Sequence, residues 1–468
     1  MTNLIERIYS NKNMVKPENI VGDIPSDREV YKTAIEVAWP SALEAVLVQL
    51  ISSADLIMVG GLGAVAISAV GITTQPRFIL LAIIFSLNIG VTAVVARRKG
   101  EDNREEANKT LRQSLVICTI LSIILSACGI IFAKPLILFA GAQSDVIESA
   151  IIYFRIICFG NFFTSLSLTI NAAQRGAGNT RISMKTNVAA NIVNLFFNYL
   201  LIHGHLGFPA LGVTGAAIAT AIGNFVGFLL SVKSITFAHE FLEIRRAQSW
   251  KLEKQTITSI LNISGSAFVE QVFMRVGFFT TNKLIAGLGT VDFATHQILM
   301  NIVSISFAFG DGLGIAASAL VGQSLGAKRS DIATIYGKSL QRIALTIGFI
   351  FVIAFILGRS FLLSLFTNDA NVIAAGVNIM LIIAATAPIQ SSNVVISGSL
   401  RGAGDTKFVA STSFVSIGLV RPGATWLFCY PLSLGLLGAW LAFATDQSLR
   451  FVINYARFKK GNWTNIKI

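Results

Sequence analysis

IEVAWPSALEAVLVQLISSADLIMVGGLG, residues 35–63, is the stretch that decides the fold of this chain. It is long and apolar enough to cross a bilayer as a helix, yet it carries two carboxylates, Glu44 and Asp55. An acid at the centre of a membrane helix costs about 2.5–3.5 kcal/mol on insertion scales, so its presence indicates a function. The spacing of 11 residues is about three helical turns, which places both acids on one face.

Two interpretations of these acids stay open. Either acid can line a polar path, or it can pair with a buried Lys or Arg and only fix the packing. The pairing interpretation is stronger for Glu44, because Glu44 lies nearer to the predicted membrane edge than Asp55 does.

The composition excludes a soluble protein of this length. Of 468 residues, 53% are hydrophobic and only 13% are charged, and the mean hydropathy is +0.69. Apolar runs of about 20 residues recur from end to end, which is typical of a polytopic membrane protein. The first thirty residues are polar and show no signal-peptide pattern, so we expect the N-terminus to be retained.

The predicted fold is an all-α polytopic membrane protein with twelve transmembrane helices in two pseudo-symmetric six-helix lobes. We expect an N-terminal segment (1–34), an N-lobe (35–238), an inter-lobe loop (239–256), a C-lobe (257–458) and a tail (459–468). The twelve expected spans are 35–61, 65–96, 110–138, 147–174, 180–203, 210–238, 257–287, 292–322, 333–361, 370–399, 405–430 and 434–458.

The basic residues are unevenly distributed. The net charge is +13, and Lys and Arg gather in alternate loops, around 97–112, 245–254, 328–329 and 459–460. The intervening loops near 61–64, 203–211, 287–292 and 431–436 carry neither residue type, which is the positive-inside pattern. It predicts both termini in the cytoplasm and a multi-pass protein of the plasma (inner) membrane, with no nucleic-acid partner. The four cysteines lie in apolar segments without ligand spacing, so we expect neither a metal site nor a disulfide frame.

An internal repeat supports the two-lobe prediction. GLG at 61–63 returns at 287–289, and GVTAVVARRKG at 90–100 aligns with AASALVGQSLG at 316–326. QRGAGNTR at 174–181 aligns with LRGAGDTK at 400–407, and all three pairs are 226 residues apart. An even number of spans per repeat orients both halves alike, an arrangement typical of transporters with a substrate cleft near the midplane.

The motifs ADLIMVGGLG, NAAQRGAGNT, GVTGAAIAT, ASALVGQSLGA and SGSLRGAGDTK together resemble the multidrug and toxic compound extrusion (MATE) family. The resemblance covers nearly the whole chain in order. It implies a twelve-helix, two-lobe exporter that exchanges an organic substrate for Na⁺ or H⁺.

The resemblance also implies a cation-coupling site. Asp55 matches the first-helix aspartate of the family, Asn194 and Asn198 match polar fifth-helix positions, and Thr220 matches a sixth-helix threonine. Asp55, Asn194 and Asn198 would be the ligands of a Na⁺ ion, because carboxylate and amide oxygens suit a hard cation. Alternatively, the two asparagines are interhelical hydrogen-bond partners with no role in coupling.

This sequence departs from two branches of the family. Asn198 stands where DinF-like members have an aspartate, so a two-acid proton relay is in doubt. Glu270 lies about one turn before the seventh-helix glutamate of NorM-like members, and Gln390 lies near their tenth-helix aspartate. We therefore expect coupling mainly in the N-lobe.

Further polar residues lie deep in apolar runs and are candidates for a substrate cavity. For the arginines among them, snorkelling or pairing with Glu44, Glu270 or Asp311 is the alternative interpretation. The candidates are Glu44, Gln75, Arg77, Glu270, Arg275, Asp311 and Gln390.

The predicted function is a Na⁺- or H⁺-coupled antiporter that exports organic, cationic or amphipathic drugs or metabolites by alternating access, with Asp55 as the coupling acid. The alternative is a lipid-linked oligosaccharide flippase or a dedicated metabolite exporter of a related superfamily. We expect no enzyme activity and no catalytic residue, because no metalloprotease, hydrolase or His-cluster motif occurs. The predicted partners are a small organic substrate and the lipid bilayer, with no cofactor beyond the coupling ion, and the chain is expected to be a monomer.

Overall fold

The computed structural model of the 468-residue chain describes residues 10–144, 146–236, 240–244, 249–367 and 369–466. These residues are nearly all helical, and no strand occurs among them. They form twelve long helical segments, so the predicted all-α fold is confirmed. The segments are α2 (Asp27–Gly60), α3 (Ala64–Gly100), α4 (Arg104–Ile131) with the short α5 (Ala133–Phe139), α6 (Ile147–Gly176), α7 (Thr180–His203), α8 (Gly212–Thr236), α9 (Lys254–Ala286), α10 (Thr290–Gly326), α11 (Ser330–Ser364), α12 (Ala370–Gly402), the run of α13 (Thr406–Ser413), η4 (Phe414–Val420) and α14 (Arg421–Cys429), and α15 (Gly435–Lys460).

Eight of the described helices are long and apolar enough to cross a membrane by length and composition alone. The other long segments carry polar residues along their length, such as Asn194 in α7, Glu270 in α9 and Asp446 in α15. Polar residues of this kind lower the mean hydropathy of α7, α9 and α15.

The helix boundaries repeat with the same period as the sequence motifs. α2 ends at residue 60 and α9 at 286, α3 ends at 100 and α10 at 326, and α6 ends at 176 and α12 at 402. Each pair is 226 residues apart. The duplication seen in the motifs therefore extends to the helix ends.

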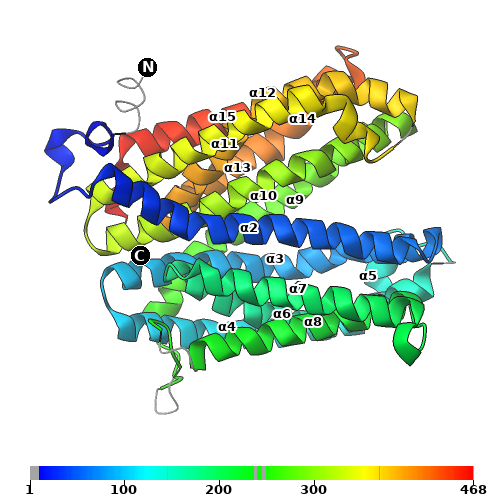
Figure 1. The fold of residues 1–468 in the computed structure, drawn as a ribbon, viewed down its shortest axis with the longest axis horizontal. Helices are drawn as coiled ribbons and strands as arrows, with labels where there is room; N and C mark the ends of the chain where they lie inside the picture. Colours follow the sequence, from blue (N-terminus) through cyan, green and yellow to red (C-terminus); the bar gives the residue numbers. More distant parts are fainter. Residues whose placement is uncertain (1–9, 145, 237–239, 245–248, 368, 467–468) are drawn as a thin grey trace. The chain divides into compact units, whose positions relative to one another are not determined.

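The chain divides into two compact units, and each is described by itself. The N-terminal unit, residues 43–268, holds the later part of α2, all of α3 to α8 and the first part of α9. Within it α6 packs against α3, α4 and α8, and α7 packs against α8 (Figure 1). Ile157 of α6, Ile202 of α7 and Ala217 of α8 are buried together in its core.

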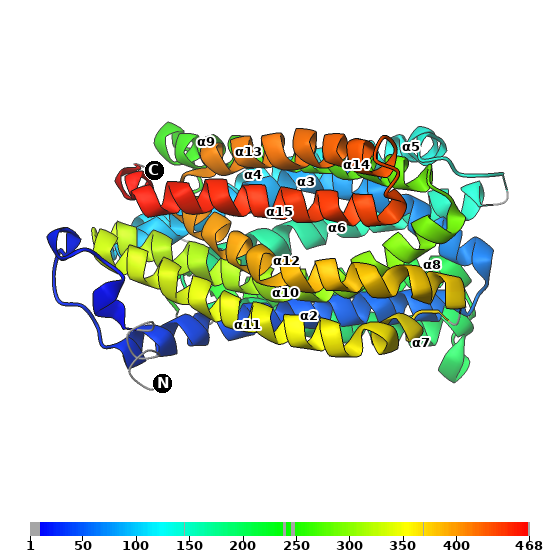
Figure 2. The ribbon, with the colours of Figure 1, turned by 90° about the horizontal axis from the view of Figure 1, so that it is seen from above.

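The C-terminal unit consists of residues 1–42 and 269–468. α12 is its central helix, because it packs against α10, α11 and α15. Figure 2 shows α13 and α14 as one continuous rod beside α15. The first part of α2 belongs to this unit, since Ala34 and Ala38 pack against Ala316 and Ala317 of α10. The helices α2 and α9 thus each contribute to both units.

The N-terminal segment is anchored to the connection between α10 and α11. The Val21 N–H donates to Asp331 Oδ2 at 3.1 Å, and Arg329 Nη2 donates to the Asp23 carbonyl at 2.7 Å. The hydrogen bond that Arg329 donates to Asp331 also raises the pKa of the Arg329 guanidinium above its usual value. These contacts fix the start of α2 within the C-terminal unit.

The helical run of α13, η4 and α14 changes form in its middle. η4 is a π-helical turn that ends immediately before Arg421 and Pro422. Because proline has no N–H to donate to the preceding turn, a wider turn at this position is a local consequence of the sequence. By contrast, α3 continues as an α-helix through Pro76.

The crossing of α10 and α12 depends on glycine. A Cβ atom at Gly398 would meet the backbone of Gly314, and one at Gly314 would lie 3.1 Å from the Val394 carbonyl oxygen. The two helices can approach this closely only because side chains are missing at the crossing.

We expect Gly398→Ala to destabilise the protein, because its methyl group would displace the α10 backbone. Gly265→Ala in α9 is the matched control, since nothing lies within 4 Å of the position where its Cβ would be. The melting temperature in detergent should fall clearly for Gly398→Ala and stay level or rise for Gly265→Ala, where alanine gains up to about 1 kcal/mol of helix propensity. Equal melting temperatures for the two variants would contradict the packing role of Gly398.

Candidate functional site

Asp55 lies on α2 in the N-terminal unit, opposite α7 and α8. Asn194 and Asn198 are one helical turn apart on α7, and Thr220 is on α8. Gly223 lets α7 and α8 approach, because a Cβ there would lie 2.7 Å from the Ala190 carbonyl oxygen and 2.8 Å from the Asn194 Cβ. The close contact of these helices places both asparagines beside the acid.

The four residues predicted for cation coupling form one hydrogen-bond network. Asn198 Nδ2 donates to Asp55 Oδ1 at 2.7 Å. With its amide nitrogen toward the acid, Asn194 donates to both Asp55 carboxylate oxygens at 3.0 Å. Its carbonyl oxygen then accepts from the Thr220 hydroxyl at 3.2 Å and from the Thr220 N–H at 3.1 Å.

Asp55 has no cationic partner in the part of the chain that the structure describes. Its hydrogen bonds come from neutral amides of residues that are 5% (Asn194) and 2% (Asn198) exposed. Neutral donors orient a buried carboxylate but do not cancel its charge. Asp55 is thus an acid whose charge is left to be balanced by a proton or a metal cation.

The Asn194 amide can face the acid with either end. In the opposite orientation its nitrogen donates to the Thr220 hydroxyl at 3.2 Å, and its oxygen lies against the carboxylate. Two oxygen acceptors in contact are stable only when a proton or a cation lies between them. Asn198 supplies another oxygen, because its buried Oδ1 has no hydrogen-bond partner. The donor set therefore fits a proton or a Na⁺ ion.

Glu44 has a different environment from Asp55. Its Oε1 accepts hydrogen bonds from Ser183 Oγ at 3.2 Å and from Asn187 Nδ2, and Arg175 Nη1 lies 3.7 Å away. Arg175 Nη1 also donates to Ser183 Oγ at 2.9 Å. The pairing interpretation thus describes the observed position of Glu44.

Glu270 is paired in the same way in the C-terminal unit. Its Oε1 accepts from Arg401 Nη2 at 2.6 Å and from Ser413 Oγ at 3.0 Å, and the residue is 2% exposed. Under the repeat offset, Arg401 corresponds to Arg175 and Ser413 corresponds to Asn187. The duplication therefore preserves a buried Glu–Arg pair, while the hydrogen-bonding helix residue has changed type.

The remaining substrate-cavity candidates are not brought together. Arg77 Nε donates to Asn161 Oδ1 at 3.3 Å, whereas Gln75 and Asp311 are exposed. Gln390 is buried with an unpartnered Nε2, and Arg275 is partly buried. In the described part of the chain, the six candidates other than Arg275 share no hydrogen bond or ion pair with one another.

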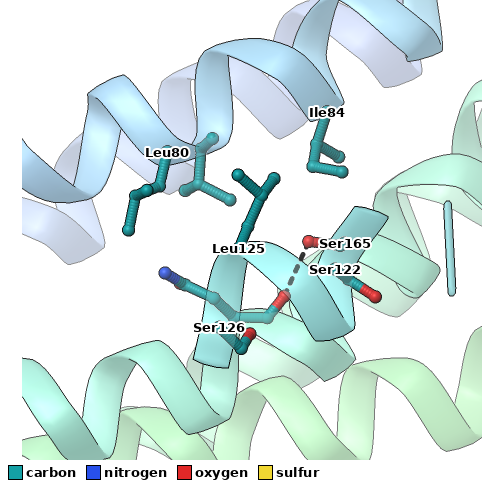
Figure 3. A pocket seen from close by; sticks show the side chains of 8 residues that line it. Leu80, Ile84, Ser122, Leu125, Ser126 and Ser165 are labelled. Atoms are coloured by element: carbon teal, nitrogen blue, oxygen red, sulfur yellow. Dashed lines mark hydrogen bonds between the residues drawn. The ribbon is translucent and has the colours of Figure 1, made fainter. Parts of the chain in front are cut away.

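A small cavity lies close to Asn161, between α3, α4 and α6 (Figure 3). Its volume of about 10 Å³ is room for a single water molecule and excludes an organic substrate. The polar atoms there are Ser122, Ser126, Ser165 and Asn161, and Ser165 Oγ donates to the Asn161 carbonyl at 2.7 Å. The cavity is therefore too small to hold a transported compound.

Sequence reasoning missed the partners of the two glutamates. Arg175 and Arg401 enter the sequence analysis only as members of the repeated motifs at 174–181 and 400–407, and Asn187 and Ser413 do not enter it. A signal was available, because an acid and an arginine both recur at the 226-residue offset. Residues that recur together in two repeats are candidates for contact.

Comparisons with known proteins agree with this architecture. The MatE family profile matches residues 40–200 and 266–427, more than half of the chain. The fold and the paired repeats define a polytopic membrane transporter, and the chain belongs to the MatE family.

Relatives align over almost the full length. A probable multidrug resistance protein NorM from Thermotoga maritima is 27% identical over 442 residues, 93% of each chain. An uncharacterized transporter, YisQ, from Bacillus subtilis is 24% identical and covers 94% of this chain and 96% of its own length. A multidrug resistance MATE family transporter of the MOP superfamily, solved in an outward-facing conformation, shares the fold at a TM-score of 0.86 and 20% identity, over 92% of this chain and 96% of its own.

We expect Arg401→Gln to destabilise the protein by about 3 kcal/mol, because it leaves the Glu270 carboxylate buried with one hydroxyl partner. The double variant Glu270→Gln/Arg401→Gln should regain most of that loss. Arg98→Gln is the control, since its ion pair with Glu101 has side chains 20% and 33% exposed and contributes less than about 1 kcal/mol. Chemical denaturation in detergent measures all three, and a harmless Arg401→Gln would contradict the structural role of the pair.

Proposed function

We propose that this protein is a cation-coupled antiporter that exports organic, cationic or amphipathic compounds, with Asp55 as the coupling acid. The observation that carries the proposal is the Asp55 carboxylate, held by Asn194 and Asn198 without a cationic partner among the described residues. The names of the relatives, which include multidrug resistance proteins, support export of drugs as the activity.

The proposed mechanism is an exchange of ligands at Asp55. In one arrangement the asparagine N–H groups face the carboxylate, as in the hydrogen bonds described above. When a proton or Na⁺ binds, Asn194 turns its oxygen toward Asp55, and the bonds that hold α7 against α2 change. A cation that enters down a 100 mV potential supplies about 2.3 kcal/mol, enough to shift a conformational equilibrium more than tenfold.

The transport cycle that follows is alternating access. Substrate binds from the cytoplasm, and the cation that arrives from outside neutralises Asp55 and lowers the affinity for substrate. The clustering of Lys and Arg in alternate loops supports a multi-pass protein of the plasma (inner) membrane with both termini in the cytoplasm. The twelve helical segments in the described residues support an exporter over the flippase alternative, for which a surplus of helices is common.

Asp55→Asn is expected to abolish coupled export while leaving the fold intact, because the amide keeps the shape but binds neither a proton nor Na⁺ strongly. Drug efflux from cells and counterflow in proteoliposomes measure the loss, and an unchanged melting temperature establishes folding. Glu44→Gln is the matched control on the same helix, since Glu44 is paired in the structure. Normal export by a well-expressed Asp55→Asn variant would refute the proposal.

The identity of the coupling ion is tested by imposing a Na⁺ gradient and a pH gradient separately on proteoliposomes. If Na⁺ is the ion, Asn198→Ala should raise the Na⁺ concentration for half-maximal counterflow about tenfold, because one oxygen ligand worth about 1.4 kcal/mol is lost. If the ion is a proton, the same variant should shift the pH dependence and leave the Na⁺ response flat. Counterflow that needs neither gradient would contradict cation coupling.

A further inference from the structure

Arg421 is a buried cation that has no hydrogen-bond or ion-pair partner among the described residues. It lies at the start of α14, directly after the π-helical turn η4, and is 4% exposed. Its side chain forms no hydrogen bond and no ion pair with any residue that the structure describes. Five N–H donors and a full positive charge in a helix core usually contact an oxygen acceptor, and among the described residues none forms a hydrogen bond or an ion pair with Arg421.

Two aromatic rings partly stabilise the charge of Arg421. The Arg421 guanidinium carbon lies 4.9 Å from the centroid of Phe278 on α9 and 4.8 Å from that of Phe443 on α15. Each cation–π contact offsets part of the cost of burying the ion but does not replace the hydrogen bonds that the guanidinium makes in water. The rings therefore flank the guanidinium but leave its hydrogen bonds to oxygen unmade.

Asp446 is an acid near Arg421, and one of its carboxylate oxygens, Oδ1, already accepts a hydrogen bond. Ser416 Oγ donates to Asp446 Oδ1, and Arg450 Nη2 lies 3.5 Å from Asp446 Oδ2. Asp446 is fully buried, and both Arg421 and Arg450 lie within its electrostatic range. Two guanidinium groups and one carboxylate leave this cluster with a net charge of +1, located at Arg421.

Neighbouring side chains add further unsatisfied donors. Trp440 is 1% exposed and His296 is 6% exposed, and neither Trp440 Nε1 nor His296 Nδ1 has a hydrogen-bond partner. The ring centroids of Phe443 and Trp440 are 5.3 Å apart, and those of Trp440 and His296 are 5.4 Å apart. A guanidinium and an indole N–H can only donate, so the ligand that suits this cluster is an acceptor with negative charge.

We propose that α9, α14 and α15 form a binding site for a monovalent organic anion, in which Arg421 binds a carboxylate and the Phe278 and Phe443 rings flank an aromatic or flat apolar body. Guanidinium binds carboxylate through two parallel hydrogen bonds, which favours this anion over a spherical one. The site lies in the C-terminal unit, whereas Asp55 lies in the N-terminal unit. Anion binding here is therefore separable from cation coupling.

The test is ligand-induced thermal stabilisation of the purified full-length protein in detergent. Sodium benzoate, substituted for sodium chloride at constant Na⁺ concentration, should raise the melting temperature by several degrees, because a ligand of the folded state alone stabilises it. Sodium acetate should act more weakly and benzyl alcohol should have no effect. Stabilisation by chloride but not by benzoate would overturn the carboxylate assignment.

Variants separate ligand binding from folding. Arg421→Gln should weaken benzoate binding at least tenfold while melting no lower than the wild type without ligand, since it removes an uncompensated charge. Arg421→Lys should retain intermediate binding, and Trp440→Phe should weaken it a few-fold if the indole N–H reaches the anion. Arg155→Gln, an exposed arginine of the N-terminal unit, is the control and should match the wild type.

Two results would refute the site. One is an undiminished benzoate response in Arg421→Gln. The other is a combination of two findings. Arg421→Gln without ligand melts well below the wild type, and Arg421→Lys keeps an unchanged benzoate response. Together these findings would assign Arg421 a role in packing and not in anion binding. Export driven through Asp55 is measured separately, so the outcome does not depend on the coupling proposal.

Discussion

A charge within an apolar helix bundle must find a partner, and this protein meets that constraint in several ways. Glu270 is neutralised by Arg401, at 2.6 Å, and hydrogen-bonded by Ser413. Glu44 relies more on neutral donors, with Arg175 at 3.7 Å. Asp55 receives neutral amides alone. The acids thus range from fully paired to uncompensated, and only an uncompensated acid can exchange a mobile cation without breaking an ion pair.

The helix α2, which carries Asp55, contributes residues to both units. Residues of α2 up to 42 belong to the C-terminal unit, whereas those from 43 belong to the N-terminal unit. Ala34 and Ala38 pack against α10, and Asp55 is hydrogen-bonded to α7. A change in the bonds between α2 and α7 therefore acts on a helix that both units share, which is the kind of element that a coupled transporter needs.

Duplication and divergence can be separated in this chain. The helix ends and the Glu–Arg pairs recur at 226 residues, so the repeats share a backbone plan and a structural ion pair. The chemistry has diverged, because Thr281 occupies the position that corresponds to Asp55. The N-terminal unit carries an uncompensated acid, and the C-terminal unit carries an uncompensated guanidinium at Arg421.

The sequence by itself determined the helical class, the twelve segments and the repeat, because apolar length and motif spacing are properties of the linear chain. It also indicated Asp55, Asn194, Asn198 and Thr220 as one group, through resemblance. Only the tertiary structure decided which charges are paired, because Glu270 and Arg401 lie on helices far apart in the chain and meet by packing. The surroundings of Arg421 among the described residues are likewise decided by packing, because Phe278 and Phe443 reach it from two other helices.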